Sequence, residues 1–262
     1  MRKFIILAVL VCAPALVFAG GSGDDWSLGA PIRGNGNMLS SEKPVSAFDS
    51  IRISRNATVN FHVSPEYRAL VTVDSNLDEY VRVYTEDGVL RIGAQRGRNY
   101  NFTRYIVDVY APSLSGVTIS GSGRFEGRDR IIARSFNLNV TGSGKIEGAF
   151  ECDYFSAGIS GSGDIVAHVS CNSLNARISG SGTIRLTGSS SDFDIVISGA
   201  GDVLGREFQT RDADLRISGS GRINIWVLEN LRANISGAGR VTYRGSPKID
   251  FRGSGAGRIQ SE

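Results

Sequence analysis

A short glycine-rich segment recurs at nearly constant spacing along the second half of this 262-residue chain. One copy reads Ile178-Ser179-Gly180-Ser181-Gly182-Thr183-Ile184. Eight copies follow one another at intervals of 18 to 21 residues. Their first glycines are Gly121, Gly142, Gly161, Gly180, Gly199, Gly219, Gly237 and Gly255. A fixed period in this range is typical of a solenoid, in which each coil contacts only its neighbours.

The residues on either side of the glycines alternate between apolar and polar types. Before Gly180, the residues Leu174, Ala176 and Ile178 are apolar, and the residues between them are polar. Alternation with period two indicates a β-strand with one buried face. An apolar residue also stands two positions after each second glycine, as Ile184 does in this copy. A second short strand is therefore expected after each glycine corner.

The corner itself requires small residues. Two strands joined by so few residues meet at a sharp bend, which glycine makes without the steric cost of a Cβ atom. The residue between the glycines is Ser in five copies and Ala in three, which favours small size over hydroxyl chemistry. One strand pair cannot bury its apolar face alone, but coils stacked about 4.8 Å apart build a continuous core. The sequence therefore predicts an all-β fold, a parallel β-helix with coils of about 19 residues and Gly-Ser-Gly corners.

The start of the chain has the features of an export signal. Residues 1–19 combine the charged Arg2 and Lys3 with an apolar run and with Ala19 before the expected cleavage point, which predicts a signal peptide. The run is shorter than the about 20 residues that a transmembrane helix needs, and no later segment is long and apolar enough. We expect an exported protein, in the periplasm, on the outer-membrane surface or secreted. Residues 20–44 are small and polar, and predict a flexible linker.

Residues 45–262 predict a single β-helix domain. The regular repeats occupy residues 114–262, and residues 45–113 predict degenerate coils that form an irregular β cap. Within the cap, Arg55 and Ala57 stand at the positions of the two corner glycines. Atypical end repeats are expected, because the end of a solenoid has to cover the core and prevent edge-to-edge association.

The composition argues against several classes of function. A net charge of only +3 gives no support for nucleic-acid binding. The two histidines, His62 and His168, are far apart in the sequence, so neither a His-based catalytic triad nor a zinc site with several His ligands is indicated. We predict no catalytic residue, no metal ion and no cofactor.

The repeat stacks aspartates of two neighbouring coils in one patch of the outer surface. They are Asp192, Asp194, Asp212 and Asp214. Stacked like charges repel one another, so a compensating group is required. Pairing with nearby Arg216 and Arg232 is one interpretation. A Ca²⁺ ion held by carboxylate oxygens, or an acid–base role in carbohydrate chemistry, is the alternative.

Two further features suggest contact with a ligand. Trp226 stands at an outward position, where it would stack on a sugar or lie partly buried under a loop. Arginines alternate with aromatic residues between residues 91 and 105, which in an exported protein suggests an anionic glycan or a lipid head group. In the other interpretation this loop packs its aromatic side chains on the cap. The residues concerned are Arg91, Arg96, Arg98, Tyr100, Phe102, Arg104 and Tyr105.

Two cysteines, Cys152 and Cys171, remain after removal of the signal peptide. Each lies ten residues after the first glycine of its repeat, so the two should stack on adjacent coils about 4.8 Å apart. That separation lies within the Cα range of a disulfide, and an exported protein meets an oxidising compartment. Stacked side chains run parallel, however, so a ladder of two free thiols is the other interpretation.

The chain also resembles the head GIN domain family of putative auto-transporter adhesins. The resemblance rests on the repeated Ile-Ser-Gly-Ser-Gly and on the segments Phe48-Asp49-Ser50-Ile51, Val71-Thr72-Val73-Asp74-Ser75-Asn76-Leu77 and Glu86-Asp87-Gly88-Val89-Leu90-Arg91-Ile92. It covers nearly all of the chain after residue 19. It implies an exported β-helical protein of a Gram-negative bacterium, with adhesion as the suggested role, and it supplies no catalytic residues.

We therefore expect an adhesin-like surface-interaction protein without catalytic activity, whose partner is a glycan or another cell-surface component. The alternative is a carbohydrate-active or glycan-binding β-helix that uses the aspartate cluster. A ligand site would then comprise Asp192, Asp194, Asp212, Asp214 and Trp226.

Overall fold

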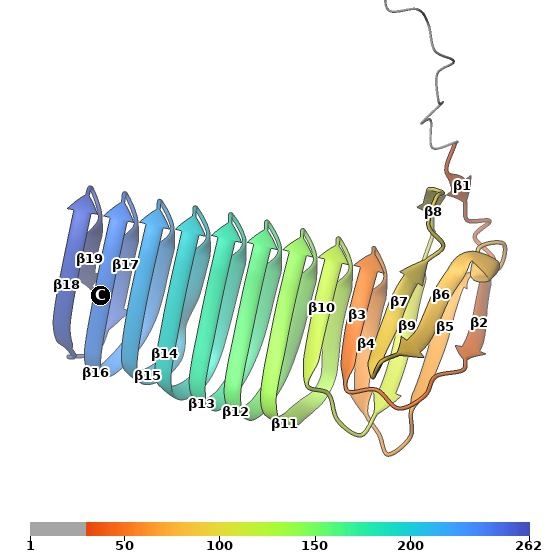
Figure 1. The fold of residues 1–262 in the computed structure, drawn as a ribbon, viewed down its shortest axis with the longest axis horizontal. Helices are drawn as coiled ribbons and strands as arrows, with labels where there is room; N and C mark the ends of the chain where they lie inside the picture. Colours follow the sequence, from red (N-terminus) through yellow and green to blue (C-terminus); the bar gives the residue numbers. More distant parts are fainter. Residues whose placement is uncertain (1–29) are drawn as a thin grey trace, which may run out of the picture.

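The structure of the protein, a computed structural model, describes residues 30–262. It consists almost entirely of β-strands, and its coils stack side by side along the long axis, with an irregular cap at the N-terminal end (Figure 1). The predicted parallel β-helix is confirmed. The predicted signal peptide, residues 1–19, and residues 20–29 of the predicted linker lie outside the described residues.

The regular part of the solenoid begins at β10. Each strand from β11 to β16 leaves one glycine corner, bends midway and leads into the next corner. The strands are β10 (Gly116–Gly121), β11 (Arg124–Gly142), β12 (Lys145–Gly161), β13 (Asp164–Gly180), β14 (Thr183–Gly199), β15 (Asp202–Gly219), β16 (Arg222–Gly237), β17 (Arg240–Arg244), β18 (Lys248–Gly255) and β19 (Arg258–Ser261).

The midway bend divides the solenoid into two facing parallel sheets. In β13 the inward side chains change parity between Val169 and Leu174, because a bend separates the two halves of the strand. We call the sheet of segments that lead into the corners the first sheet, and the sheet of segments that leave the corners the second sheet. The core fills the space between them.

The register is the one that the repeat predicts. Ile178 lies between Ile159 and Ile197 of the neighbouring coils, and all three side chains are at most 3% exposed. Equivalent residues therefore form continuous apolar columns through the core, as cross-strand pairs do in other sheets.

The corners have to be glycine for two reasons. Gly180 has a φ of 127°, a conformation that side chains rarely adopt. A Cβ atom there would also collide with the carbonyl oxygen of Gly161 in the coil below. The corner atoms join neighbouring coils directly, because the N–H of Ser181 donates to that same Gly161 oxygen at 2.9 Å. In the cap, Arg55 takes the equivalent position with a φ of 70°, opposite Gly121, as the sequence predicted.

The cap combines parallel and antiparallel pairing. Its elements are β1 (Ile32–Arg33), β2 (Met38–Lys43), β3 (Ser50–Arg55), β4 (Thr58–Val63), β5 (Arg68–Asp74), the 3₁₀ turn η1 (Asp78–Tyr80), β6 (Val81–Glu86), β7 (Val89–Ala94), β8 (Tyr100–Asn101) and β9 (Tyr105–Ala111). β3 pairs parallel with β7 and β10 and extends the first sheet, whereas β4 pairs with β9 and β11 and extends the second. β6 and β7 form an antiparallel hairpin. No helix within residues 30–262 has the length and apolar character to cross a lipid bilayer.

The prediction of a flexible linker over residues 20–44 is wrong for its last part. β2 pairs antiparallel with β5 from Met38↔Asp74 to Lys43↔Ala69. The segment gave no strand signal because most of its side chains are polar and exposed. Its order comes from main-chain hydrogen bonds and from ionic contacts such as that of Lys43 with Asp78 at 2.8 Å.

Asp74 fixes the start of the described chain to the cap. Its side chain is fully buried, and its two carboxylate oxygens accept hydrogen bonds from the N–H groups of Gly36 at 2.9 Å and Thr103 at 2.8 Å. Burial acts to raise the pKa of Asp74, but hydrogen bonds from the N–H groups of Gly36 and Thr103, the Thr103 hydroxyl and the Arg104 N–H outweigh it and hold the pKa below its usual value.

Candidate functional site

The outer surface of the first sheet, which we call the first-sheet face, is built from in-register rows of polar side chains. One row consists entirely of exposed hydroxyls and follows the corners from the cap to the last coil. Its members are Ser54, Ser120, Thr141, Ser160, Ser179, Ser198, Ser218, Ser236 and Ser254. The row arises because the residue before each corner points outward.

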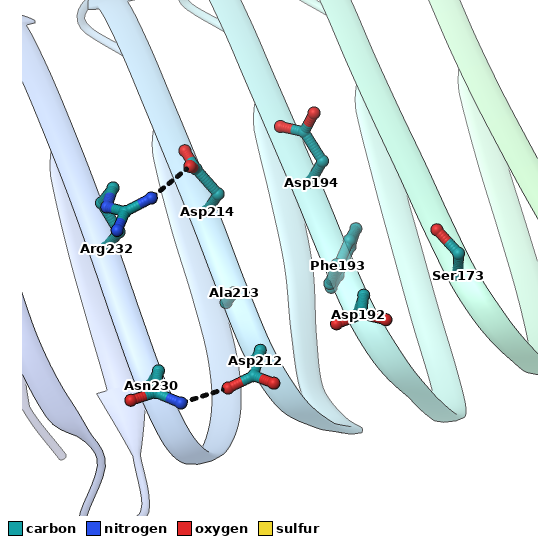
Figure 2. A pocket seen from close by; sticks show the side chains of 9 residues that line it. All are labelled: Ser173, Asp192, Phe193, Asp194, Asp212, Ala213, Asp214, Asn230 and Arg232. Atoms are coloured by element: carbon teal, nitrogen blue, oxygen red, sulfur yellow. Dashed lines mark hydrogen bonds and ion pairs between the residues drawn. The ribbon is translucent and has the colours of Figure 1, made fainter.

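The four predicted aspartates lie together on this face. Asp192 is opposite Asp212, and Asp194 is opposite Asp214, as the repeat predicted. With Ser173, Asn230 and Arg232 they line an open depression of about 430 Å³, the aspartate pocket (Figure 2). It lies over the strand halves that follow the midway bend of β14, β15 and β16.

Arginines compensate the stacked carboxylates, as the first of the two interpretations expects. Arg216 contacts Asp194 at 3.4 Å and Asp214 at 3.1 Å. Arg232 contacts Asp214 at 3.6 Å and Asp250 of the next coil at 3.5 Å. These groups are partly exposed, so each ion pair contributes modestly to stability.

The second pair of stacked aspartates, Asp192 and Asp212, has its own partners. Arg211 contacts Asp212 at 2.9 Å and Asp192 at 3.8 Å. The amide of Asn230 donates to Asp212 at 2.6 Å, and this hydrogen bond, followed by that from Arg211, holds the pKa of Asp212 below its usual value. Asp212 is therefore ionised at neutral pH and is unsuited to act as a general acid.

The calcium interpretation of the aspartates finds no support in the geometry. Among residues 30–262, no group of three or more His, Cys, Asp or Glu side chains is arranged to hold a metal ion. Asp214 contacts Arg232 instead, and Asp212 accepts a hydrogen bond from Asn230 (Figure 2).

Trp226 does not join the aspartates. It lies in the half of β16 that belongs to the second sheet, opposite Gln209 and Arg244, whereas the aspartates lie on the first. Its ring is half-buried, and the guanidinium of Arg244 lies 4.4 Å from the ring centroid. One face of the ring is therefore occupied by a cation–π contact, which leaves less surface for a sugar than the sequence suggested.

Cys152 and Cys171 are in-register neighbours on β12 and β13, as predicted. Both are half-buried free thiols in the structure, so the disulfide is not formed there. Burial, with a smaller effect of Asp153, raises the pKa of Cys152 to about 11. Burial, with a smaller effect of Cys152, raises the pKa of Cys171 to about 12. The thiols are therefore protonated and poorly nucleophilic at neutral pH.

The aromatic residues of the predicted basic loop pack on the cap. Phe102 and Tyr105 are at most 8% exposed, and the rings of Tyr80, Tyr100 and Phe102 follow one another at centroid distances of 5.2 and 5.8 Å. This confirms the packing interpretation and removes these aromatic rings from ligand binding.

Of the four arginines in that region, Arg91 and Arg96 line a pocket, with two further arginines that the sequence did not link to them, whereas Arg98 and Arg104 do not line it. Arg91 and Arg96 meet Arg52 and Arg82 around an open pocket of about 480 Å³ at the cap end of the first-sheet face. Tyr84 also lines this pocket, which we call the arginine pocket. Arg52 and Arg91 are far apart in the sequence and outside the regular repeat, so no spacing predicted that they lie opposite each other.

The fold and its surface define the class of protein: a two-sheet β-solenoid with an irregular cap and a long polar face over its first sheet. Over residues 47–247 the chain matches the family described as "Putative auto-transporter adhesin, head GIN domain". The chain therefore belongs to the head GIN domain family, as its sequence motifs suggested.

Solved structures support this assignment. A crystal structure described as a putative adhesin from Parabacteroides merdae ATCC 43184 is 25% identical, has a TM-score of 0.85, and covers 88% of this chain and 98% of its own. One described as a putative lipid binding protein from Parabacteroides distasonis ATCC 8503 is 27% identical, with a TM-score of 0.85 and coverage of 89% and 100%. No curated protein matches the chain.

Proposed function

We propose that this protein is an exported, adhesin-like interaction module that binds glycans or other cell-surface components through its first-sheet face and performs no catalysis. The observation that carries the proposal is the unbroken hydroxyl row from Ser54 to Ser254, flanked by the arginine pocket at one end and the aspartate pocket towards the other. A rigid face of regularly spaced hydroxyls, amides and charges suits a long, repetitive, polar ligand.

The aspartate pocket favours binding over turnover. A glycosidase needs one carboxylic acid with a raised pKa and one free carboxylate. Here Asp212 has a lowered pKa, and Asp194 and Asp214 share the guanidinium of Arg216. The family of adhesins supports the same view.

A lipid is the second ligand to consider, because one relative is described as a putative lipid binding protein. Acyl chains need an apolar cavity. In residues 30–262 the space between the two sheets is filled by buried side chains such as Phe136, Phe155 and Phe193. This supports a polar ligand on the outer face over an acyl chain inside.

The test combines a glycan array with an assay of polysaccharide turnover. We expect binding of a subset of glycans and no release of reducing ends. The variants Asp194→Asn and Asp214→Asn serve as controls. Turnover by the wild type that disappears in these variants would contradict the proposal and favour a carbohydrate-active enzyme.

Export is tested separately. We expect the N-terminus of the protein isolated from a Gram-negative host to begin at Gly20, and the protein to fractionate with the periplasm, the outer membrane or the medium. Recovery of the intact chain from the cytoplasm alone would contradict this part of the proposal.

A further inference from the structure

We propose that the arginine pocket binds the carboxylate or sulfate groups of an acidic glycan. This inference rests on the proposed function, and it assigns both a site and a ligand class to the first-sheet face. The pocket lies where β3, β6 and β7 meet, and four arginines line it together with Tyr84.

Strand pairing forces the positive charges together. Arg52 on β3 lies directly opposite Arg91 on β7. On the other side of β7, Arg91 lies opposite Tyr84, and Arg82 lies opposite Gly93. Like charges on directly opposed residues of neighbouring strands are destabilising unless another charge compensates them.

The pocket holds little negative charge of its own. Glu86 contacts Arg91 at 2.6 Å. Within residues 30–262, no carboxylate lies within ion-pair distance of Arg52, Arg82 or Arg96. The aspartate pocket differs in this respect, because arginines there offset each stacked pair of carboxylates. An anionic ligand would supply the negative charge that is needed to compensate these arginines.

Part of the pocket is held in place before any ligand binds. Arg82 donates hydrogen bonds to the carbonyl oxygens of Glu79 at 2.7 Å and Val81 at 2.8 Å, and to the side-chain oxygen of Gln95 at 3.2 Å. A side chain at Gly93 would collide with the hydroxyl of Ser54, so this glycine keeps the floor of the pocket open.

The surroundings favour an acidic glycan over other anions. Guanidinium groups bind carboxylates and sulfates in paired hydrogen bonds. Ser54 and Ser120 line the same pocket and begin the hydroxyl row, which offers hydrogen bonds to the next sugar units. Tyr84 is 44% exposed and presents an aromatic ring with a polar tip. A lipid head group would bring acyl chains, for which the neighbouring polar surface has no place.

The experiment measures binding of the purified protein to defined probes by titration calorimetry. The acidic probes are an oligogalacturonate and a heparin-derived oligosaccharide, and a maltooligosaccharide of equal length is the neutral probe. Vesicles that contain phosphatidylglycerol and a single-stranded oligothymidylate represent the other two sources of anionic groups. The pocket variant is the double change Arg52→Gln and Arg96→Gln, since neither side chain has an ion pair within the described residues.

A matched control removes two arginines from the opposite side of the solenoid. Arg240 and Arg258 are in-register, exposed residues of the second sheet, without an ion pair in the described part of the chain. The double change Arg240→Gln and Arg258→Gln therefore alters net charge equally. Thermal unfolding of both variants verifies that they fold.

We expect an acidic probe to bind, and its affinity to fall as salt is added. The pocket variant should bind the acidic probe at least about tenfold more weakly than the wild type, whereas the affinity of the control variant should stay within about twofold of the wild-type value. Equal losses in both variants, no loss in the pocket variant, or binding confined to vesicles or to the oligonucleotide would overturn the inference. Binding of neutral glycans alone on the array would overturn it and leave the proposed function standing, whereas an absence of binding to any glycan or surface component would overturn both.

Discussion

Asp194 lies directly opposite Asp214 on the neighbouring coil, and the guanidinium of Arg216 is shared between their carboxylates, at 3.4 and 3.1 Å. The repeat places the like charges together, because equal coil lengths stack equal positions. An arginine two residues after Asp214 on the same strand offsets them, since alternate residues of a strand share one face.

Replacing this arginine should therefore expose the repulsion. We expect Arg216→Gln to destabilise the protein by about 1 kcal/mol at low salt, because Arg216 is over half exposed and exposed pairs are worth little each. For a chain of this size that corresponds to a fall in melting temperature of about 2–4 °C. The difference should shrink in high salt, where charges are screened. Adding Asp194→Asn should restore stability, and an unchanged loss in that double variant would contradict the argument.

The core register can be tested with adjacent residues of one strand. Ile197 is fully buried between Ile178 and Ile217, whereas its neighbour Val196 points outward. Ile197→Asp should lower the free energy of unfolding, measured by denaturant titration, by at least about 3 kcal/mol, because it buries an unpaired charge. Val196→Asp, which places the same group on the surface, should cost less than about 1 kcal/mol. Similar losses for both variants would refute the assignment of faces.

The paired thiols should react slowly in the folded protein. Because the pKa of Cys152 is raised to about 11 and that of Cys171 to about 12, little thiolate exists at neutral pH. We expect alkylation by iodoacetamide at pH 7.5 to be much slower in native than in denaturant-unfolded protein. Equal alkylation rates in the native and the unfolded protein would contradict this expectation.

The raised pKa values also mean that the thiols contribute to the stability of the fold below pH about 8.5, and that this contribution is lost as pH rises through the folded pKa values.

Whether the two cysteines are bonded when the protein is in an oxidising compartment stays a prediction. A disulfide between Cys152 and Cys171 would close a loop of about 19 residues and add about 3 kcal/mol in the chain-entropy model. Thiol titration of unfolded, unreduced protein measures the bond directly. Two titratable thiols mean that it is absent, and none means that it has formed.

At acidic pH, protonation of Asp74 should weaken the contact between the start of the described chain and the cap. Its pKa is lowered in the folded state, so its contribution to stability is present above the unfolded pKa of about 3.9 and is lost as pH falls through the folded value. Asp74→Ala should cost about 2–4 kcal/mol at pH 7, because the N–H groups of Gly36 and Thr103 lose their acceptors.

The matched control for this change is Asp87→Asn, at an exposed turn residue. Urea unfolding at pH 7 and at pH 3 should show a smaller effect of Asp74→Ala at the lower pH, and no such difference for Asp87→Asn. A pH-independent effect of Asp74→Ala would show that its carboxylate charge is unimportant.

The sequence predicted the structure of the regular coils more completely than that of the N-terminal cap. In the regular coils, spacing alone placed Ile178 on Ile197, Cys152 beside Cys171 and Asp194 beside Asp214, and each pairing is found. The physical reason is that a parallel solenoid pairs each strand with its own equivalent one period later, so that sequence spacing is the register.

The cap follows no such rule. The strand β2, which the sequence assigned to a linker, pairs antiparallel with β5, and Arg52 lies opposite Arg91 because β3 pairs parallel with β7. No period links such segments, and their register is set by which apolar faces cover the end of the core. The chain by itself therefore determined the solenoid, its columns of buried residues and its stacked aspartates. Only the tertiary structure decided that four arginines meet in one pocket, because long-range pairing in the cap brings together β3, β6, β7 and the turn that follows β7.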